Sequence, residues 1–183
     1  AKTLCQGDSI TYGQGVSSNK GYPERLQELR NQRFIDRGIR GITAGKSVYQ
    51  TQVNIDETNP DRVTLMLGTN NINIGSSKSD ILGSMQTIIN IIRSNGVEPV
   101  LCTIPPYVGP VKSYNDDVES YNNGLRELGA LNNIRVPRIF AAFNNSSSFM
   151  QSDGFHPNTA GQDLMASVIH AKLGPPTVCP PRL

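Results

Sequence analysis

Short β-prone apolar runs alternate with longer helical patterns along this chain, and this alternation restricts the fold more than any other feature. The predicted strands are the five runs at residues 2–7, 33–39, 61–68, 97–106 and 134–140. Amphipathic spacing predicts helices at residues 21–33, 78–96, 116–131 and 158–174. This order predicts a parallel sheet with helices on both faces. We expect one domain over residues 1–174 and a Pro-rich tail over residues 175–183.

The predicted segments differ in how clearly the sequence indicates a strand or a helix. Residues 61–68 are almost continuously apolar, as is typical of a strand buried on both faces. Pro137 weakens the prediction of a strand at 134–140. Segment 78–96 has the clearest helical pattern, with Ser79 as the predicted N-cap and Gly96 as the predicted stop. Its apolar stripe consists of Ile81, Leu82, Met85, Ile88, Ile89 and Ile92.

Charge and composition argue against several classes of partner. The formal net charge is +2, and the Lys and Arg residues are spread along the sequence without a basic stripe, so we expect no nucleic-acid partner. No apolar run approaches the ~20 residues that a membrane span needs. The first residue is Ala1 rather than Met, which together with the low Lys content favours a secreted or extracytoplasmic protein, with the cytoplasm as the alternative. The oligomeric state is left open.

Three cysteines bear on metal binding and redox state. Cys5 and Cys102 lie in apolar runs and are predicted to be buried thiols, whereas Cys179 in the tail could be free or paired. The Cys and His spacing fits no zinc site, and only His156 and His170 are present. We therefore expect no metal and no cofactor.

Polar and glycine residues follow the predicted strands. In parallel α/β sheets the carboxyl ends of the strands meet at one edge, which is where sites form. The segments that follow the strands are Gly7–Ser9, residues 38–45, Gly68–Asn71, residues 103–107 and, some fifteen residues after the last strand, residues 152–158. We expect these segments to lie together.

Ser9 and His156 are the candidate nucleophile and base. Ser9 opens a helix-like turn, where unpaired backbone N–H groups help a hydroxyl ionise. For an isolated Gly-Asp-Ser, a simple helix cap is the more economical interpretation. Asp153 precedes His156 by three residues and could turn back to orient the imidazole, which would take the Ser9 proton. Alternatively, Asp153 is a cap and Pro157 the first residue of a helix.

Candidate oxyanion donors lie on two other loops. The Asn70 carboxamide follows the most buried strand and could donate to a developing oxyanion, although Gly-Thr-Asn-Asn is also good turn chemistry. Gly41 could bring a backbone N–H to the same point or be an ordinary loop glycine. Each purely structural alternative is reasonable by itself. Together, however, they would require several unrelated residues to coincide at one edge of the sheet. The combination predicts a centre for acyl transfer.

These blocks resemble the SGNH hydrolases, also called GDSL-type esterases and lipases, over roughly residues 2–173. The matching blocks are Gly7-Asp8-Ser9, the glycine placed at Gly41, Gly68-Thr69-Asn70 and Asp153-Gly154-Phe155-His156-Pro157. The resemblance implies a flavodoxin-like three-layer α/β/α sandwich with a five-stranded parallel sheet. It also implies a Ser9–His156–Asp153 triad and an oxyanion hole formed by Ser9, Gly41 and Asn70.

This sequence departs from the family pattern at two positions. Asn71 and Ile42 stand where the family often has Asp. Neither residue carries the expected chemistry, but both substitutions question how firmly the loops of the oxyanion hole are braced.

The expected function is a serine esterase that forms an acyl-enzyme on Ser9. Short loops favour small substrates, such as acetyl or short-chain esters of an alcohol that could be a sugar. The alternatives are a lysophospholipase or acyl-thioesterase of the same family, and a non-catalytic binding module on this fold. The candidate substrate contacts, which could equally be ordinary loop packing, are Asp8, Tyr12, Asn71, Ile72 and Tyr107.

Overall fold

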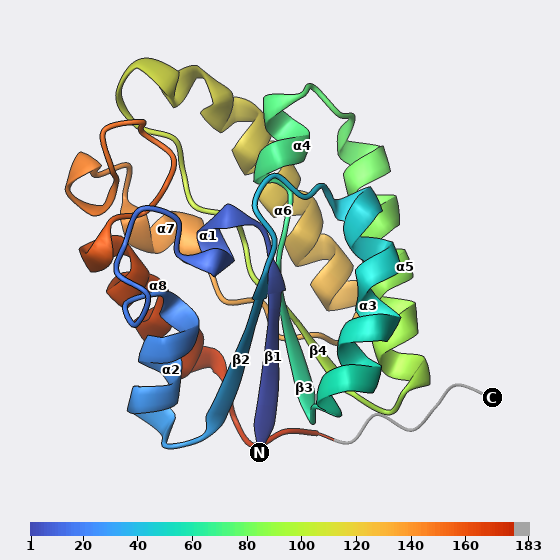
Figure 1. Ribbon diagram of the computed structural model, residues 1–183. Helices are drawn as coiled ribbons and strands as arrows, with labels where there is room; N and C mark the ends of the chain where they lie inside the picture. The colour runs from blue at the N-terminus through green and yellow to red at the C-terminus, as the bar shows by residue number, and fades with distance from the viewer. Residues whose placement is uncertain (178–183) are drawn as a thin grey trace.

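The computed structural model describes residues 1–177, and a parallel sheet lies there between two layers of helices (Figure 1). The strands of this part of the chain are β1 (Lys2–Gly7), β2 (Arg33–Gly38), β3 (Arg62–Met66) and β4 (Glu98–Leu101), in the order β2-β1-β3-β4. Every pairing is parallel. The predicted α/β class and parallel sheet are therefore confirmed. The four strands run in one direction, so their carboxyl ends form the upper edge of the sheet in Figure 1.

Helices cover both faces of the sheet. The α-helices are α1 (Ser9–Tyr12), α2 (Tyr22–Arg30), α3 (Ala44–Thr58), α4 (Thr69–Asn73), α5 (Lys78–Ser94), α6 (Asn115–Asn132), α7 (Ile139–Phe143) and α8 (Thr159–Lys172). Two 3-10 turns are η1 (Gly109–Tyr114) and η2 (Ser147–Phe149). Helices α2 and α8 pack together on one face, while α3, α5 and α6 pack side by side on the other (Figure 1). None of the helices within residues 1–177 is both long and apolar enough to cross a membrane.

The prediction of a fifth strand at 134–140 is wrong for a reason that lies in Pro137. The segment does run beside β4, because the N–H groups of Leu101 and Thr103 donate to the carbonyls of Arg135 (3.1 Å) and Pro137 (3.1 Å). A parallel ladder also needs the N–H of residue 137 to return a bond to Leu101, and proline has no N–H. The segment therefore runs along the edge of the sheet, and its carbonyls accept hydrogen bonds from Leu101 and Thr103 without Pro137 donating one in return.

Helix α3 was not predicted because its buried face is largely polar. Ser47, Thr51, Asn54 and Thr58 are all buried along this helix. The Gln6 side chain on β1 donates to the hydroxyls of Ser47 (2.8 Å) and Thr51 (2.9 Å). A hydrogen-bonded contact of this kind leaves no apolar period in the sequence, which is the signal that a helix prediction needs.

Helix α5 and two cysteines agree closely with expectation. The apolar stripe of α5 is buried except for Leu82, which is partly buried. The N-cap is Ser77, whose side chain accepts from the Asp80 N–H, rather than Ser79. Cys5 and Cys102 are buried free thiols as predicted, and burial raises the pKa of Cys102 to about 12. Cys179 lies outside the described residues.

Candidate active site

Ser9 is the first residue of α1, and a single residue separates it from the end of β1. The preceding residue, Asp8, caps the helix because its Oδ1 accepts from the Ile10 N–H at 2.9 Å. The neighbouring strand approaches so closely that a Cβ on Gly38 would lie 2.2 Å from the Tyr12 backbone nitrogen, so only glycine fits there. Since Asp8 is the cap, the hydroxyl of Ser9 is left for another partner.

That partner is His156, which lies 147 positions further along the chain. The Ser9 Oγ and the His156 Nε2 are 2.9 Å apart, and both side chains are buried. On the other side of the ring, His156 Nδ1 lies 2.5 Å from Asp153 Oδ2. The structure therefore brings the three predicted residues into one hydrogen-bonded chain.

The loop that carries Asp153 and His156 holds the carboxylate by backbone groups. Asp153 Oδ1 accepts from the N–H groups of Phe155 (3.1 Å) and His156 (3.0 Å). Gly154 has a φ of +82°, and a Cβ there would lie 2.5 Å from the Val108 carbonyl oxygen. A glycine is needed for the backbone to turn at this point, and this turn lets a separation of three residues place the carboxylate against its own imidazole.

Hydrogen bonds keep the Asp153 carboxylate ionised. Partial burial opposes ionisation, but the bonds from His156 and Phe155 outweigh it and lower the pKa of Asp153 below its usual value of 3.8. A carboxylate at Oδ2 fixes the proton of a neutral imidazole on Nδ1. Nε2 is then unprotonated and can accept from the Ser9 hydroxyl.

The three predicted oxyanion donors, Ser9, Gly41 and Asn70, lie on the segments that follow β1, β2 and β3. Within residues 1–177, neither the Ser9 N–H nor the Gly41 N–H has a hydrogen-bond acceptor. Gly41 is exposed, and its loop is tied to the end of β1 by a 3.0 Å bond from the Ile39 N–H to the Gly7 carbonyl. The Asn70 side chain donates one of its two amide hydrogens to the Ile42 carbonyl at 2.9 Å. The other amide hydrogen has no acceptor among residues 1–177.

The two departures from the family pattern leave these loops braced. Asn71 is buried, and its Oδ1 accepts from the Ala44 N–H at 2.9 Å at the start of α3. An Asp at this position would accept in the same way. Ile42 is buried in the core, and its carbonyl holds the Asn70 side chain. The loops of the candidate oxyanion hole are therefore joined by side-chain bonds in spite of both substitutions.

Four of the five predicted substrate contacts are buried. Asp8, Asn71, Ile72 and Tyr107 are between 1% and 7% exposed, whereas Tyr12 is 53% exposed. The Tyr107 hydroxyl donates to Asn73 Oδ1 at 2.5 Å, and its ring stacks on Phe155, which in turn packs against His156. These four residues pack beneath the candidate site, and Tyr12 is the one candidate of the five with an exposed side chain, while contact of any of the five with a substrate stays a prediction.

Two hollows lie near the segments that carry Ser9 and His156, although neither of these residues lines them. One of about 350 Å³ lies beside α1 and β2 and is lined by Tyr12, Gly38 and Ile39, among others. Another of about 340 Å³ is lined by Tyr107, Val108 and Lys112, next to the loop that carries His156. Among residues 1–177, no group of three or more His, Cys, Asp or Glu side chains could hold a metal ion.

Two glutamines join the parts of the site, and sequence reasoning missed both. Gln162 on α8 is fully buried, donates to the Ile10 carbonyl (3.0 Å) and accepts from the Tyr22 N–H (2.8 Å). Gln151 donates to the carbonyls of Gln14 (2.7 Å) and Pro157 (2.9 Å), and so ties the segment after α1 to the His156 loop. Neither lies in a recognisable motif, so only their contacts reveal them.

Comparison with known proteins gives consistent results. The model of the GDSL-like Lipase/Acylhydrolase family matches residues 5–164. An arylesterase of Vibrio mimicus is 25% identical over 179 residues, which cover 94% of this chain and 88% of that protein. Esterase TesA of Pseudomonas aeruginosa is 24% identical over 94% of this chain and 87% of its own. The crystal structure of the acetyl xylan esterase AlAXEase has a TM-score of 0.82 at 21% identity, covering 95% of this chain and all of the other.

Proposed function

The chain belongs to the GDSL-like lipase/acylhydrolase family of ester hydrolases, and from this premise we propose that it is a serine esterase for short-chain acyl esters. The observation that carries the proposal is the continuous hydrogen-bonded chain from Ser9 Oγ through His156 to Asp153. Such a chain positions a hydroxyl, a base and an orienting acid for nucleophilic catalysis.

In the proposed reaction Ser9 Oγ attacks the acyl carbon while His156 Nε2 takes its proton. Asp153 holds the proton of Nδ1 and offsets the charge of the imidazolium that forms. The carbonyl oxygen becomes an oxyanion, for which the N–H groups of Ser9 and Gly41 and the side chain of Asn70 are the proposed donors. His156 then protonates the leaving alcohol, and water attacks the acyl-enzyme in the same way, which returns Ser9 to its starting state.

The surface beside Ser9 favours substrates with a small acyl group. A long acyl chain needs a contiguous apolar groove, yet Ile72 and Tyr107, which could line one, are buried and engaged in packing. Tyr12 and Ile74 remain exposed, at 53% and 71%. We propose acetyl and other short-chain esters as substrates, with sugar hydroxyls among the leaving alcohols. A location outside the cytoplasm stays a prediction.

A series of p-nitrophenyl esters with acyl chains from acetyl to octanoyl tests this proposal. We expect the highest kcat/KM for the shortest chains, and loss of nearly all turnover in Ser9→Ala. Ser18→Ala, which removes an exposed hydroxyl in the next loop, is the matched control and should leave activity unchanged. Asn70→Ala should lower kcat by about 10²–10³ with a smaller change in KM, as expected for loss of one oxyanion donor.

Each outcome has a clear meaning. Equal activity of wild type and Ser9→Ala would overturn the role of Ser9. A folded protein without activity on any ester or thioester would instead support a binding module. Preference for octanoyl esters, or for long-chain acyl thioesters, would overturn the short-chain assignment and favour the lysophospholipase or acyl-thioesterase alternative.

A further inference from the structure

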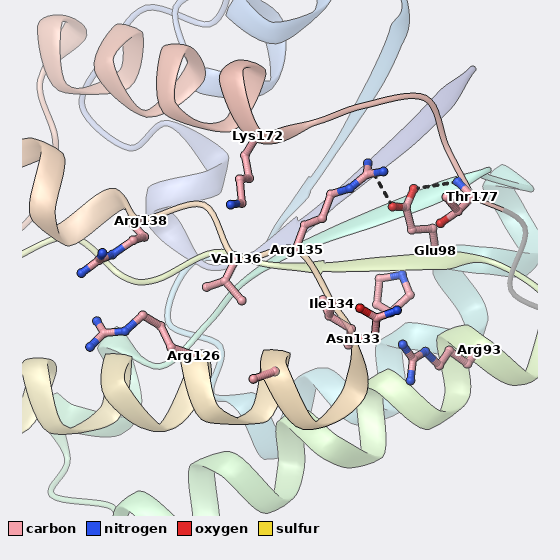
Figure 2. Close-up of a pocket in the computed structure, with 12 residues that line it drawn as sticks. Arg93, Glu98, Arg126, Asn133, Ile134, Arg135, Val136, Arg138, Lys172 and Thr177 are labelled. Carbon is pink, nitrogen blue, oxygen red and sulfur yellow. Dashed lines mark hydrogen bonds and ion pairs between the residues drawn. The ribbon is translucent and has the colours of Figure 1, made fainter.

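A basic groove runs along the open edge of the sheet, away from Ser9. It has a volume of about 560 Å³ and begins at Glu98, the first residue of β4, whereas the candidate active site lies after the ends of the strands. Figure 2 shows segment 134–138 crossing it between α8 and α6. We call it the edge groove and define it by its charged lining residues, Arg93, Arg126, Arg135, Arg138, Lys172 and Glu98.

The edge groove carries a strong excess of positive charge. Five of its side chains are cationic and one is a carboxylate, although the formal net charge of the whole chain is only +2. That carboxylate, Glu98, is already shared by Arg62 (2.8 Å) and Arg135 (3.3 Å). Arg138 and Lys172 are exposed and form no ion pair within residues 1–177. The groove can therefore accept negative charge from outside.

The cations come from separate elements, which explains why the sequence shows no basic stripe. Arg93 lies in the last turn of α5, Arg126 lies in α6 and Lys172 ends α8, while Arg135 and Arg138 belong to the edge segment. The fold brings these cations together on one face, although they are spread over eighty positions of the sequence. Among residues 1–177, no residue that lines this groove is aromatic, so this part of the chain offers no platform on which nucleic-acid bases could stack.

The floor of the edge groove is a sheet edge with unused backbone groups. The carbonyls of Arg135 and Pro137 face β4, where they accept hydrogen bonds. The intervening residue, Val136, faces the other way, because backbone groups alternate along an extended chain. Its N–H and C=O have no hydrogen-bond partner among residues 1–177. A further extended chain could pair with Val136 here.

The cations stand on both sides of that edge. Figure 2 places Lys172 on the α8 side of the segment and Arg126 and Arg93 on the side of α6 and α5. Side chains of an added strand point alternately to the two faces of the sheet, so carboxylates along such a strand would meet cations on both sides. Arginine suits this task because its guanidinium binds carboxylates in a planar, two-bond geometry.

From these observations we propose that the edge groove docks an extended acidic peptide segment of a partner protein, which adds a strand beside Val136. The competing explanation is that the cations only keep two sheet edges of different copies from pairing, since charge on an edge strand is a common protection against such pairing. The two explanations differ in whether acidic peptides bind.

Binding is tested with a fluorescent peptide of Glu-Glu-Thr repeats, about seven residues long and blocked at both ends, which places Glu side chains on both faces of an added strand and is titrated with the full chain. We expect saturable binding at low ionic strength that weakens strongly in about 0.5 M salt, because the ion pairs are exposed. The peptide with Gln in place of Glu should not bind. A peptide N-methylated at every residue, which keeps its charge but has no backbone N–H on either edge to pair with Val136, should bind much more weakly.

Matched variants locate the site. The double variant Arg126→Gln/Arg138→Gln should weaken binding about tenfold, since each of its two substitutions removes one exposed charge contact with the peptide. Arg33→Gln removes an exposed arginine from β2, at the opposite edge of the sheet, and should leave binding unchanged. Ester hydrolysis should be the same in all of these proteins.

Three results would overturn the proposal. Absence of peptide binding would leave the protective role of the cations. Equal binding of the N-methylated peptide, or of an acidic polysaccharide, would show that the groove recognises charge without adding a strand. An equal loss of affinity in Arg33→Gln would place the binding elsewhere.

Discussion

At the scale of single residues, Asp8, which precedes Ser9 in the sequence, is a buried carboxyl group. Asp8 is 1% exposed, and its Oδ1 caps the Ile10 N–H. Its Oδ2 is buried without a hydrogen-bond partner among residues 1–177. Burial raises the pKa of Asp8 from 3.8 to about 7 because the charged form loses its hydration, and the bond from Ile10 offsets only part of this. The folded protein therefore holds a proton that the unfolded chain releases at lower pH.

This difference predicts how stability depends on pH. Below about pH 4, Asp8 is protonated in both states and has no effect. Between about pH 4 and pH 7 the folded state binds more protons than the unfolded state, so the free energy of unfolding falls as the pH rises, by up to a few kcal/mol. Asp8→Asn keeps the Oδ1 cap and removes the titration. We expect the variant to gain stability over wild type progressively between pH 4 and pH 7 in urea unfolding.

The comparison between wild type and variant isolates Asp8 from other titrating groups. Asp36, whose pKa is raised to about 6 chiefly by burial, contributes a similar slope to both proteins and cancels in the difference. A constant difference between the two stability curves across pH 4–7 would contradict a raised pKa for Asp8. If Asp8→Asn were less stable than wild type at pH 7, the Asp8 carboxylate of the wild-type protein would be stabilised at that pH.

At the scale of elements, sequence reasoning worked where one residue type dictates one local structure. The apolar run ending at Gly7 predicted β1, and the spacing of Asp153 and His156 predicted a loop that turns back on itself. It failed where tertiary contacts decide. The buried face of helix α3 carries Ser and Thr side chains that bind Gln6, so the sequence shows no apolar period there. The supports of the site, Gln151 and Gln162, act across distances that no local pattern records.

The failed fifth strand gives a prediction at this scale. Pro137→Ala supplies the N–H that the Leu101 carbonyl lacks, which is worth about 1 kcal/mol. It also removes the stiffness of proline from the unfolded chain, which costs about 0.4–1 kcal/mol. We therefore expect little change in the free energy of unfolding, together with a slowly exchanging amide at position 137 in hydrogen exchange.

Pro110→Ala is the matched control, because position 110 lies in the first turn of η1, where N–H groups have no partner within the helix. Its new amide should exchange rapidly. Equally rapid exchange at position 137 would contradict the view that proline alone interrupts the pairing with β4.

At the scale of the whole molecule, a buried ion pair joins the sheet to the C-terminal end of the fold. Arg62 on β3 is fully buried, and its Nε donates to Glu98 Oε2 on β4 at 2.8 Å. Its Nη2 donates to the Gly174 carbonyl, just beyond α8, at 2.8 Å. Glu98 also pairs with Arg135 of the edge segment and accepts from the Thr177 N–H. One carboxylate thus connects four segments that are far apart in sequence.

Removing that carboxylate should be far more costly than removing an exposed one. Glu98→Ala leaves the Arg62 charge buried without its partner, and we expect a loss of about 3–5 kcal/mol in the free energy of unfolding, measured with urea. Glu57→Ala, which breaks the exposed Arg37–Glu57 pair, is the matched control and should cost about 1 kcal/mol or less. The double variant Arg62→Met/Glu98→Leu removes both charges, and should recover much of the stability that Glu98→Ala loses. If the double variant were no more stable than Glu98→Ala, the loss would come from packing around Glu98 rather than from an unpaired charge, and the ion pair would not be what holds these segments together.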